Sequence, residues 1–257
     1  MITPMVARLV RDPFDREGWL FELKWDGFRT IAETDGTNGV KLYSRNQKDF
    51  KKRFSPIADA LAKLKESAIL DGELVALDEH GHPRFEWLLN RGPQKGTLVY
   101  YVFDLLKLGD VELRSEPLRR RKKLLEKFLK GNPRLLYVEH VEREGLAMFA
   151  GALALGVEGI VAKDAKSPYV EGPRVTWHWQ KIKNRDYQRQ EKVEFHPRKA
   201  KLSPDPIPPR EVRKQTDEIR RCPRTTNHRP QSECSCYASQ QELGSLRFEN
   251  PPAPRGS

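Results

Sequence analysis

The stretch Lys24-Trp25-Asp26-Gly27-Phe28-Arg29 carries the information that decides the fold class. It follows an apolar segment, Trp19–Lys24, whose alternation predicts a β-strand. A lysine at the end of a strand can act as a nucleophile once it has lost its proton, which nearby cations and desolvation favour. Gly27 allows a tight turn and close approach of the backbone. Taken alone, the stretch is equally compatible with a surface strand that ends in an Asp-Gly hairpin turn.

Five further stretches give this lysine a context. In chain order they are Ser44-Arg45-Asn46, Asp71-Gly72-Glu73, Phe103-Asp104, Glu158-Gly159-Ile160-Val161-Ala162-Lys163 and Lys181-Ile182-Lys183. Glu73 lies in an otherwise apolar run, where a carboxylate needs a partner, a ligand or a metal. Lys181 and Lys183 alternate on one strand, so their side chains are expected on the same face. By themselves, Arg45 would be an exposed cation and Phe103 a core aromatic.

Together the six stretches resemble the KxDGxR motif of covalent nucleotidyltransferases and the motifs that accompany it. The sequence is most similar in this respect to ATP-dependent DNA ligases, particularly the ligase domain of bacterial end-joining ligase D. The resemblance implies an α+β nucleotidyltransferase fold, similar to ATP-grasp ligases, with antiparallel sheets flanked by helices. It also implies that Lys24 attacks the α-phosphate of ATP and forms a lysyl-AMP phosphoramidate. AMP would then pass to a 5′-phosphate at a nick, and the 3′-hydroxyl would displace it.

The resemblance also assigns roles to individual residues. Glu22, two residues before the nucleophile, would contact the adenine, because a carboxylate can accept from an exocyclic amine. Without the lysine beside it, Glu22 would be interpreted as a solvated charge on a strand. Phe103 would lie flat on the adenine, and Arg45 would bind near the ribose or the phosphates. The remaining cations expected to bind the phosphates are Arg29, Lys181 and Lys183.

Two carboxylates from distant segments fit a metal site. The resemblance places Glu73 near the ribose hydroxyls and the metal, and Glu158 opens an apolar strand in the same way. Mg²⁺ prefers carboxylates together with phosphate oxygens and keeps several waters. The expected cofactors are therefore ATP and Mg²⁺ or Mn²⁺.

Residues 1–187 are expected to form the adenylation domain. Apolar alternation predicts further strands over Val40–Tyr43, Ile69–Leu77 and Leu98–Asp104. Helical periods cover Ser55–Ser67, Glu116–Lys130 and Glu144–Leu155. Pro56 and Pro117 are expected in the first turns of the first two helices, and Gly131 and Gly156 at the C-terminal caps of the last two.

Residues 188–257 differ in composition. They hold 10 of the 19 prolines and many arginines, and their apolar residues lack the alternation that a small barrel requires. We therefore predict a disordered tail rather than the OB-fold that members of the family usually carry after the adenylation domain. Cys222, His228, Cys234 and Cys236 offer four possible zinc ligands, although the Cys-x-Cys spacing is tight for such a site.

The chain of 257 residues has a net charge of +11, which favours a polyanionic partner. The expected substrate is nicked or broken duplex DNA, with end-joining proteins or a separate partner carrying an OB-fold as further candidates. No apolar run is long enough to span a membrane, and a cytoplasmic location in DNA repair is expected. Alternatives are a truncated enzyme competent only for self-adenylation and a non-catalytic nucleic-acid-binding remnant. An RNA ligase or a capping guanylyltransferase, which share the lysine motif, fits less well.

Overall fold

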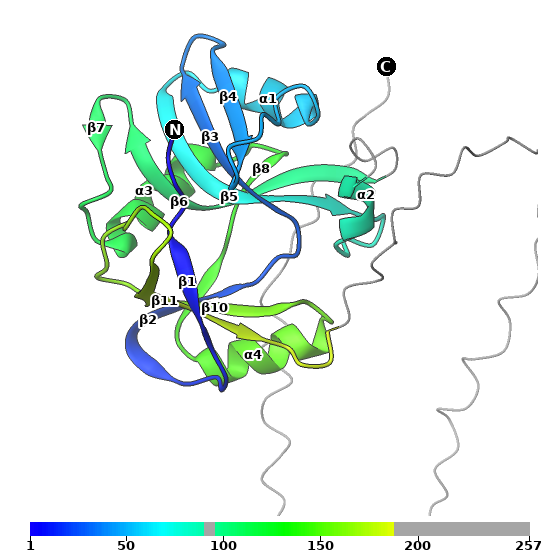
Figure 1. Ribbon diagram of the computed structural model, residues 1–257, viewed down its shortest axis with the longest axis vertical. Helices are drawn as coiled ribbons and strands as arrows, with labels where there is room; N and C mark the ends of the chain where they lie inside the picture. The colour runs from blue at the N-terminus through cyan, green and yellow to red at the C-terminus, as the bar shows by residue number, and fades with distance from the viewer. Residues whose placement is uncertain (90–95, 188–257) are drawn as a thin grey trace, which may run out of the picture. The chain divides into compact units, whose positions relative to one another are not determined.

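The computed structural model describes residues 1–89 and 96–187 (Figure 1). The predicted tail, with its possible zinc ligands, lies outside the described residues. Two β-sheets and four helices account for the regular structure of the part that is described. No helix in this part is long and apolar enough to cross a bilayer.

Lys24 directly follows β2 (Arg16–Leu23), an inner strand of the first sheet. The strand order of this sheet is β1-β11-β10-β2-β9. The other strands are β1 (Val6–Val10), β9 (His140–Arg143), β10 (Gly159–Asp164) and β11 (Val175–Lys183). Pairing is antiparallel except between β1 and β11, which run parallel. Helix α4 (Gly145–Ala154) packs on one face of this sheet around Phe21, Ala152 and Ile160.

The second sheet contains the larger core. Its main path is β4-β3-β5-β6-β7, and β8 joins β6 from the side. The strands are β3 (Phe28–Asp35), β4 (Val40–Ser44), β5 (Ser67–Leu77), β6 (Thr97–Leu108), β7 (Val111–Glu112) and β8 (Leu135–Tyr137). Helices α1 (Ser55–Ala62), α2 (Phe85–Leu89) and α3 (Leu118–Leu129) contribute apolar side chains to this core, among them Ile57, Leu88 and Leu125. The burial of these side chains supplies most of the driving force for the packing.

The two sheets meet around a small cluster of buried side chains. Trp179 belongs to β11 of the first sheet, and Met5 directly precedes β1 of the same sheet. Leu106 belongs to β6 of the second sheet, and Tyr169 completes the cluster. Phe103 packs against the same cluster. Because this cluster joins the sheets, it fixes the walls of the space between them.

The predicted α+β fold with helices flanking the sheets is confirmed, and the predicted strands are all present. The structure corrects several details. The first helix ends at Ala62 rather than Ser67, because Ser67 already begins β5. Pro117 precedes α3 as its N-cap residue instead of lying in the first turn. Pairing is not wholly antiparallel, since β6 and β8 also run parallel.

The glycines predicted to end the last two helices have the expected backbone. Gly131 has φ +81° and Gly156 φ +63°, directly after the C-cap residues of α3 and α4. This left-handed region favours glycine at the end of a helix. The hairpin interpretation of Asp26-Gly27 is wrong, because β2 and β3, which this segment connects, belong to different sheets.

Candidate active site

A cavity of about 490 Å³ is lined by residues from both sheets. The residues from the predicted site that line it are Glu22, Lys24, Arg29, Arg45, Glu73, Phe103 and Lys181. Glu158 and Lys183 do not line it, but both are joined to the site by ion pairs around Lys24. The structure thus brings together residues that are up to about 160 positions apart in the sequence.

Lys24 follows directly after β2, and its side chain meets a carboxylate from β10's N-terminal end. Lys24 Nζ lies 2.5 Å from Glu158 Oε2, and Lys183 Nζ lies 2.9 Å from Glu158 Oε1. The backbone N–H of Lys24 also donates to the carbonyl of Gly159 at 2.9 Å. Burial opposes ionisation of Glu158, but the charges and hydrogen bonds of the two lysines hold its pKa below the ordinary value.

Gly27 lets the backbone after Lys24 approach the second sheet closely. A Cβ atom on Gly27 would lie 2.0 Å from the carbonyl oxygen of Leu74 and 3.0 Å from Glu73 Cγ. No side chain fits at such distances, so the requirement for glycine comes from close packing rather than from an unusual φ. This packing places Glu73 in the wall of the cavity, next to the segment that follows Lys24.

Glu73 and Arg29 lie opposite each other on β5 and β3. Burial raises the pKa of Glu73 to about 7, although the charges of Lys24 and Arg29 act in the opposite direction. Arg29 points to a neighbouring acid instead: its Nε and Nη2 atoms donate to the Asp71 carboxylate at 2.7 and 2.6 Å. The guanidinium is therefore already neutralised within the protein, and its predicted contact with phosphate stays a prediction.

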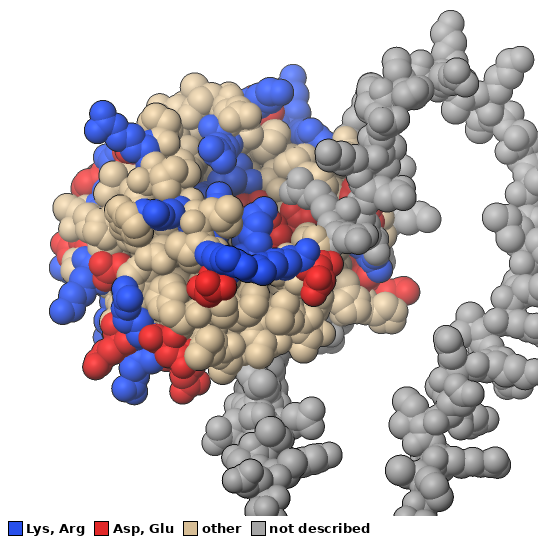
Figure 2. Space-filling view, turned by 60° about the horizontal axis from the view of Figure 1, so that its bottom comes forward, with Lys and Arg blue, Asp and Glu red and all other residues tan. Residues whose placement is uncertain are grey.

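Lys181 and Lys183 point to one face of β11, as the alternation predicted. They pair with Val161 and Gly159 of β10 in register. Burial and the neighbouring charges of Lys24, Lys183 and Arg45 together lower the pKa of Lys181. A cluster of like charges that repel one another gains stability when an anion binds between them. Figure 2 shows Lys and Arg side chains gathered at the centre of one face, with acidic side chains beside them.

Glu22 is not a solvated charge, so that interpretation is wrong. It is 2% exposed, and its two oxygens contact two ammonium groups. Lys122 Nζ lies 2.6 Å from Oε1, and Lys163 Nζ lies 2.5 Å from Oε2. Burial opposes its ionisation, but Lys122 and Lys163 hold the pKa of Glu22 below the ordinary value.

Sequence reasoning assigned no role to Lys163, although it closes the quoted stretch that begins at Glu158. Lys163 is buried, lines the cavity, and lies 4.3 Å from the Phe103 ring and 4.2 Å from the Trp179 ring. Burial and the charge of Lys122 lower the pKa of Lys163 to about 8, against the attraction of Glu22. The sequence did contain a signal for Lys163, because a charged residue at the end of the apolar run Ile160-Val161-Ala162 needs a partner or a ligand. Lys122 lacked even that signal, because it lies in a helix with many basic residues.

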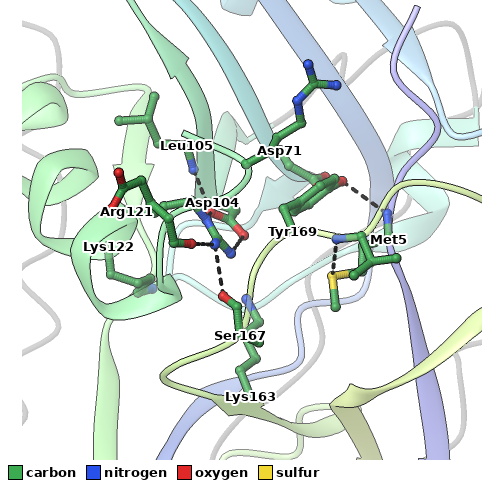
Figure 3. A network of polar contacts seen from close by, with 12 residues as sticks. Met5, Asp71, Asp104, Leu105, Arg121, Lys122, Lys163, Ser167 and Tyr169 are labelled. Atoms are coloured by element: carbon green, nitrogen blue, oxygen red, sulfur yellow. Dashed lines mark hydrogen bonds and ion pairs between the residues drawn. The ribbon is translucent and has the colours of Figure 1, made fainter. Parts of the chain in front are cut away.

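Asp71 and Asp104 face each other on β5 and β6, and each is tied to an arginine. Arg121 of α3 donates to both oxygens of Asp104 at 2.7 and 2.9 Å, and Tyr169 donates to Asp71 at 2.6 Å. Figure 3 shows this network, in which the Tyr169 hydroxyl also accepts from the backbone N–H of Met5, the residue before β1. These buried pairs hold the two walls of the cavity in place.

The two predicted metal ligands, Glu73 and Glu158, both lie close enough to Lys24 to experience its charge. Among residues 1–89 and 96–187, no group of three or more acidic, histidine or cysteine side chains can hold a metal ion without other ligands. Mg²⁺ commonly takes one or two carboxylates and completes its shell with phosphate oxygens and water. Glu73 and Glu158 fit that kind of site, in which the nucleotide supplies the remaining ligands.

This fold, with a lysine in a cavity lined by both sheets and with Lys181 and Arg45 in the same cavity, defines a nucleotidyltransferase-type site. The chain belongs to the ATP-dependent DNA ligase domain family, whose model matches residues 4–183. It is 32% identical over 189 residues to the SPbeta prophage-derived DNA ligase-like protein LigB of Bacillus subtilis, covering 72% of this chain and 68% of that protein. It is 35% identical to the multifunctional non-homologous end joining protein LigD of Pseudomonas aeruginosa, over 65% of this chain and 20% of that protein.

Solved structures agree with this family. The mycobacterial DNA ligase D complexed with ATP and MES is 33% identical, with a TM-score of 0.62. The match covers 71% of this chain and 60% of that chain. The chain therefore spans less than two thirds of this structure and only a fifth of the Pseudomonas relative.

Proposed function

We propose that the protein is an ATP-dependent DNA ligase in which Lys24 becomes covalently adenylated. The observation that carries this proposal is the placement of Lys24 in the cavity, 2.5 Å from Glu158, with Lys181 of β11 and Arg45, which directly follows β4, lining the same cavity. The Lys24 amine, once deprotonated, would attack the α-phosphorus of ATP and form a P–N bond. The bond from phosphorus to the bridging oxygen would break, and pyrophosphate would leave with the electron pair.

The side chains around Lys24 would each support this step. Lys181, Lys183 and Arg45 would neutralise the phosphate oxygens, where charge develops in the transition state. Glu22 would accept from the adenine amine, and Phe103 would supply a flat apolar surface for the ring. When bound, Mg²⁺ would add positive charge at the phosphates, with Glu73 and Glu158 as the protein ligands.

The later steps would transfer AMP to the 5′-phosphate of a nick in duplex DNA and seal it. The identities of the relatives support this: one is a DNA ligase-like protein and another a multifunctional non-homologous end joining protein. The net charge of +11 supports binding to a polyanion. A role in DNA repair at a cytoplasmic location, end-joining partners, and a disordered tail after residue 187 stay predictions.

The experiment that tests the proposal is incubation of the purified full chain with ATP and Mg²⁺, followed by intact mass measurement and a nick-sealing assay. A single added AMP, absent in Lys24→Ala, would support the adenylation step. An adduct formed with GTP and not with ATP would overturn the ligase assignment in favour of a capping-type enzyme. Salt-sensitive DNA binding without any adduct would support the non-catalytic alternative instead.

A second candidate function is self-adenylation without strand sealing by the chain alone. The observation that favours it is that the match covers only 60% of the mycobacterial DNA ligase D chain. Nicked DNA that already carries a 5′-adenylate separates the two: a complete ligase seals it without ATP, whereas an enzyme limited to the first step does not.

A further inference from the structure

Glu22 is clamped from two sides by lysines that come from different elements. Lys163 belongs to β10, beside β2, whereas Lys122 belongs to α3, a hundred residues along the chain from Glu22. Each lysine contacts a different carboxylate oxygen, at 2.6 Å for Lys122 and 2.5 Å for Lys163. A carboxylate held in this way has one orientation rather than several.

The two lysines differ in their relation to the cavity. Glu22 and Lys163 line it, but Lys122 does not. Lys122 is 1% exposed, also donates to the carbonyl of Val138 at 2.6 Å, and lies 4.2 Å from the Tyr137 ring. Lys122 therefore holds Glu22 from behind the cavity wall, with two of its N–H bonds fixed by protein acceptors.

Helix α3, which carries Lys122, is itself fixed to β6, the strand of Phe103. Arg121, the residue before Lys122, donates to Asp104, which directly follows Phe103. It also donates to the carbonyl of Ser167 at 3.0 Å. Figure 3 shows Arg121 and Lys122 side by side at the start of α3, with Asp104 and Ser167 in contact with the arginine. Two consecutive buried cations of one helix thus connect to the strand of Glu22 and to the strand of Phe103.

We propose that Lys122 is a positioning residue that determines the selection of adenine by holding the Glu22 carboxylate in place. This inference rests on the proposed function, in which Glu22 accepts from the adenine amine. Guanine carries a carbonyl oxygen where adenine carries its amine, so a fixed carboxylate at that point repels guanine and attracts adenine. A carboxylate held by Lys163 alone can rotate about that contact, and it then discriminates less well between these two groups.

The test compares three variants of the full chain. Lys122→Met removes the charge and keeps the length, Lys122→Arg keeps the charge, and Lys123→Met is the matched control on the exposed side of the same helix. The rate of adduct formation is measured with ATP and with purine riboside triphosphate, which lacks the amine. We expect Lys122→Met to raise the KM for ATP about tenfold and to lower the ATP preference by a similar factor, with kcat nearly unchanged. Lys122→Arg is expected to recover part of the preference, and Lys123→Met to match the wild type.

An equal loss with both nucleotides would show that Lys122 acts only on stability, and would overturn the inference. If Lys122→Met does not fold, the double variant Glu22→Gln/Lys122→Met is compared with Glu22→Gln. The double variant removes the carboxylate and the ammonium charge together, so it leaves no buried charge unpaired between these two residues. The two variants should then show the same nucleotide preference, and a further loss in the double variant would overturn the inference. A wild-type protein that forms no adduct would refute the proposed function and this inference together, whereas an adduct with unchanged preference in Lys122→Met would refute the inference alone.

Discussion

Lys24 and Glu158 form an ion pair of 2.5 Å across neighbouring strands, and the second oxygen of Glu158 is occupied by Lys183. One carboxylate thus holds the proposed nucleophile and a predicted phosphate-binding lysine at the same time. The arrangement keeps both ammonium groups near the cavity while the carboxylate stays ionised, with a pKa below its ordinary value.

Glu158→Gln should therefore impair adenylation strongly. The amide cannot balance two ammonium groups, and it is a weaker metal ligand than a carboxylate. We expect the rate of adduct formation to fall about a hundredfold or more. Glu142→Gln is the control, because Glu142 lies on β9 of the same sheet as β10 and forms only an exposed pair, with Arg119 of α3. A Glu158→Gln protein with the wild-type rate would exclude this role.

Glu73 should give the folded protein a distinctive pH dependence. Its pKa is about 7 in the fold against an ordinary value of 4.5, so the folded state binds more protons between these values. Stability from this group is complete below pH 4.5 and is lost as the pH rises through about 7. Allowing for its partial exposure, the loss should be on the order of 1 to 2 kcal/mol.

Glu73→Gln should remove this component of the pH dependence. Urea unfolding of both proteins at pH 5 and pH 8 measures it, because the contributions of other groups cancel in the difference. If the variant loses as much stability between the two pH values as the wild type, the burial of an ionisable Glu73 is not the cause.

Asp71→Asn should be among the most destabilising single changes. Asp71 is buried and accepts from Arg29 and Tyr169, so the variant leaves a partly buried guanidinium without its counter-ion. Breaking a fully buried pair costs about 3 to 5 kcal/mol, and since Arg29 keeps some contact with solvent we expect a loss of about 2 to 4 kcal/mol. Glu112→Gln, which breaks the partly exposed pair with Arg114, should cost no more than about 1 kcal/mol. Similar unfolding free energies for the two variants would contradict this difference.

Gly27→Ala tests the close packing behind the nucleophile. An added Cβ would lie 2.0 Å from the backbone oxygen of Leu74, which cannot move without distorting β5. Overpacking of this kind costs about 1 to 3 kcal/mol, and adenylation should fall as Lys24 is displaced. Gly151→Ala in α4 has open space and should be neutral or slightly stabilising. Equal behaviour of the two variants in thermal unfolding would argue against the packing account.

The sequence predicted the elements well where local patterns were strong. Alternation located the strands on which Glu22, Glu73 and Phe103 lie, and glycines located the ends of α3 and α4. It could not show that β2 and β3 enter different sheets, because strand pairing depends on contacts far apart in the chain. The same limit hid the role of Lys122, because its partners lie on other elements and nothing in the basic helix around it separates it from an ordinary surface charge. The apolar run marked Asp71 as unusual, but its partners Arg29 and Tyr169 could not be predicted.

Peptide mass mapping after reaction with ATP and Mg²⁺ tests most directly whether Lys24 is the residue that becomes adenylated. We predict one AMP per chain, attached through the Lys24 Nζ atom, and no adduct on a folded Lys24→Ala protein. An AMP group mapped to Lys163 or Lys181, or an adduct that survives in Lys24→Ala, would contradict the account.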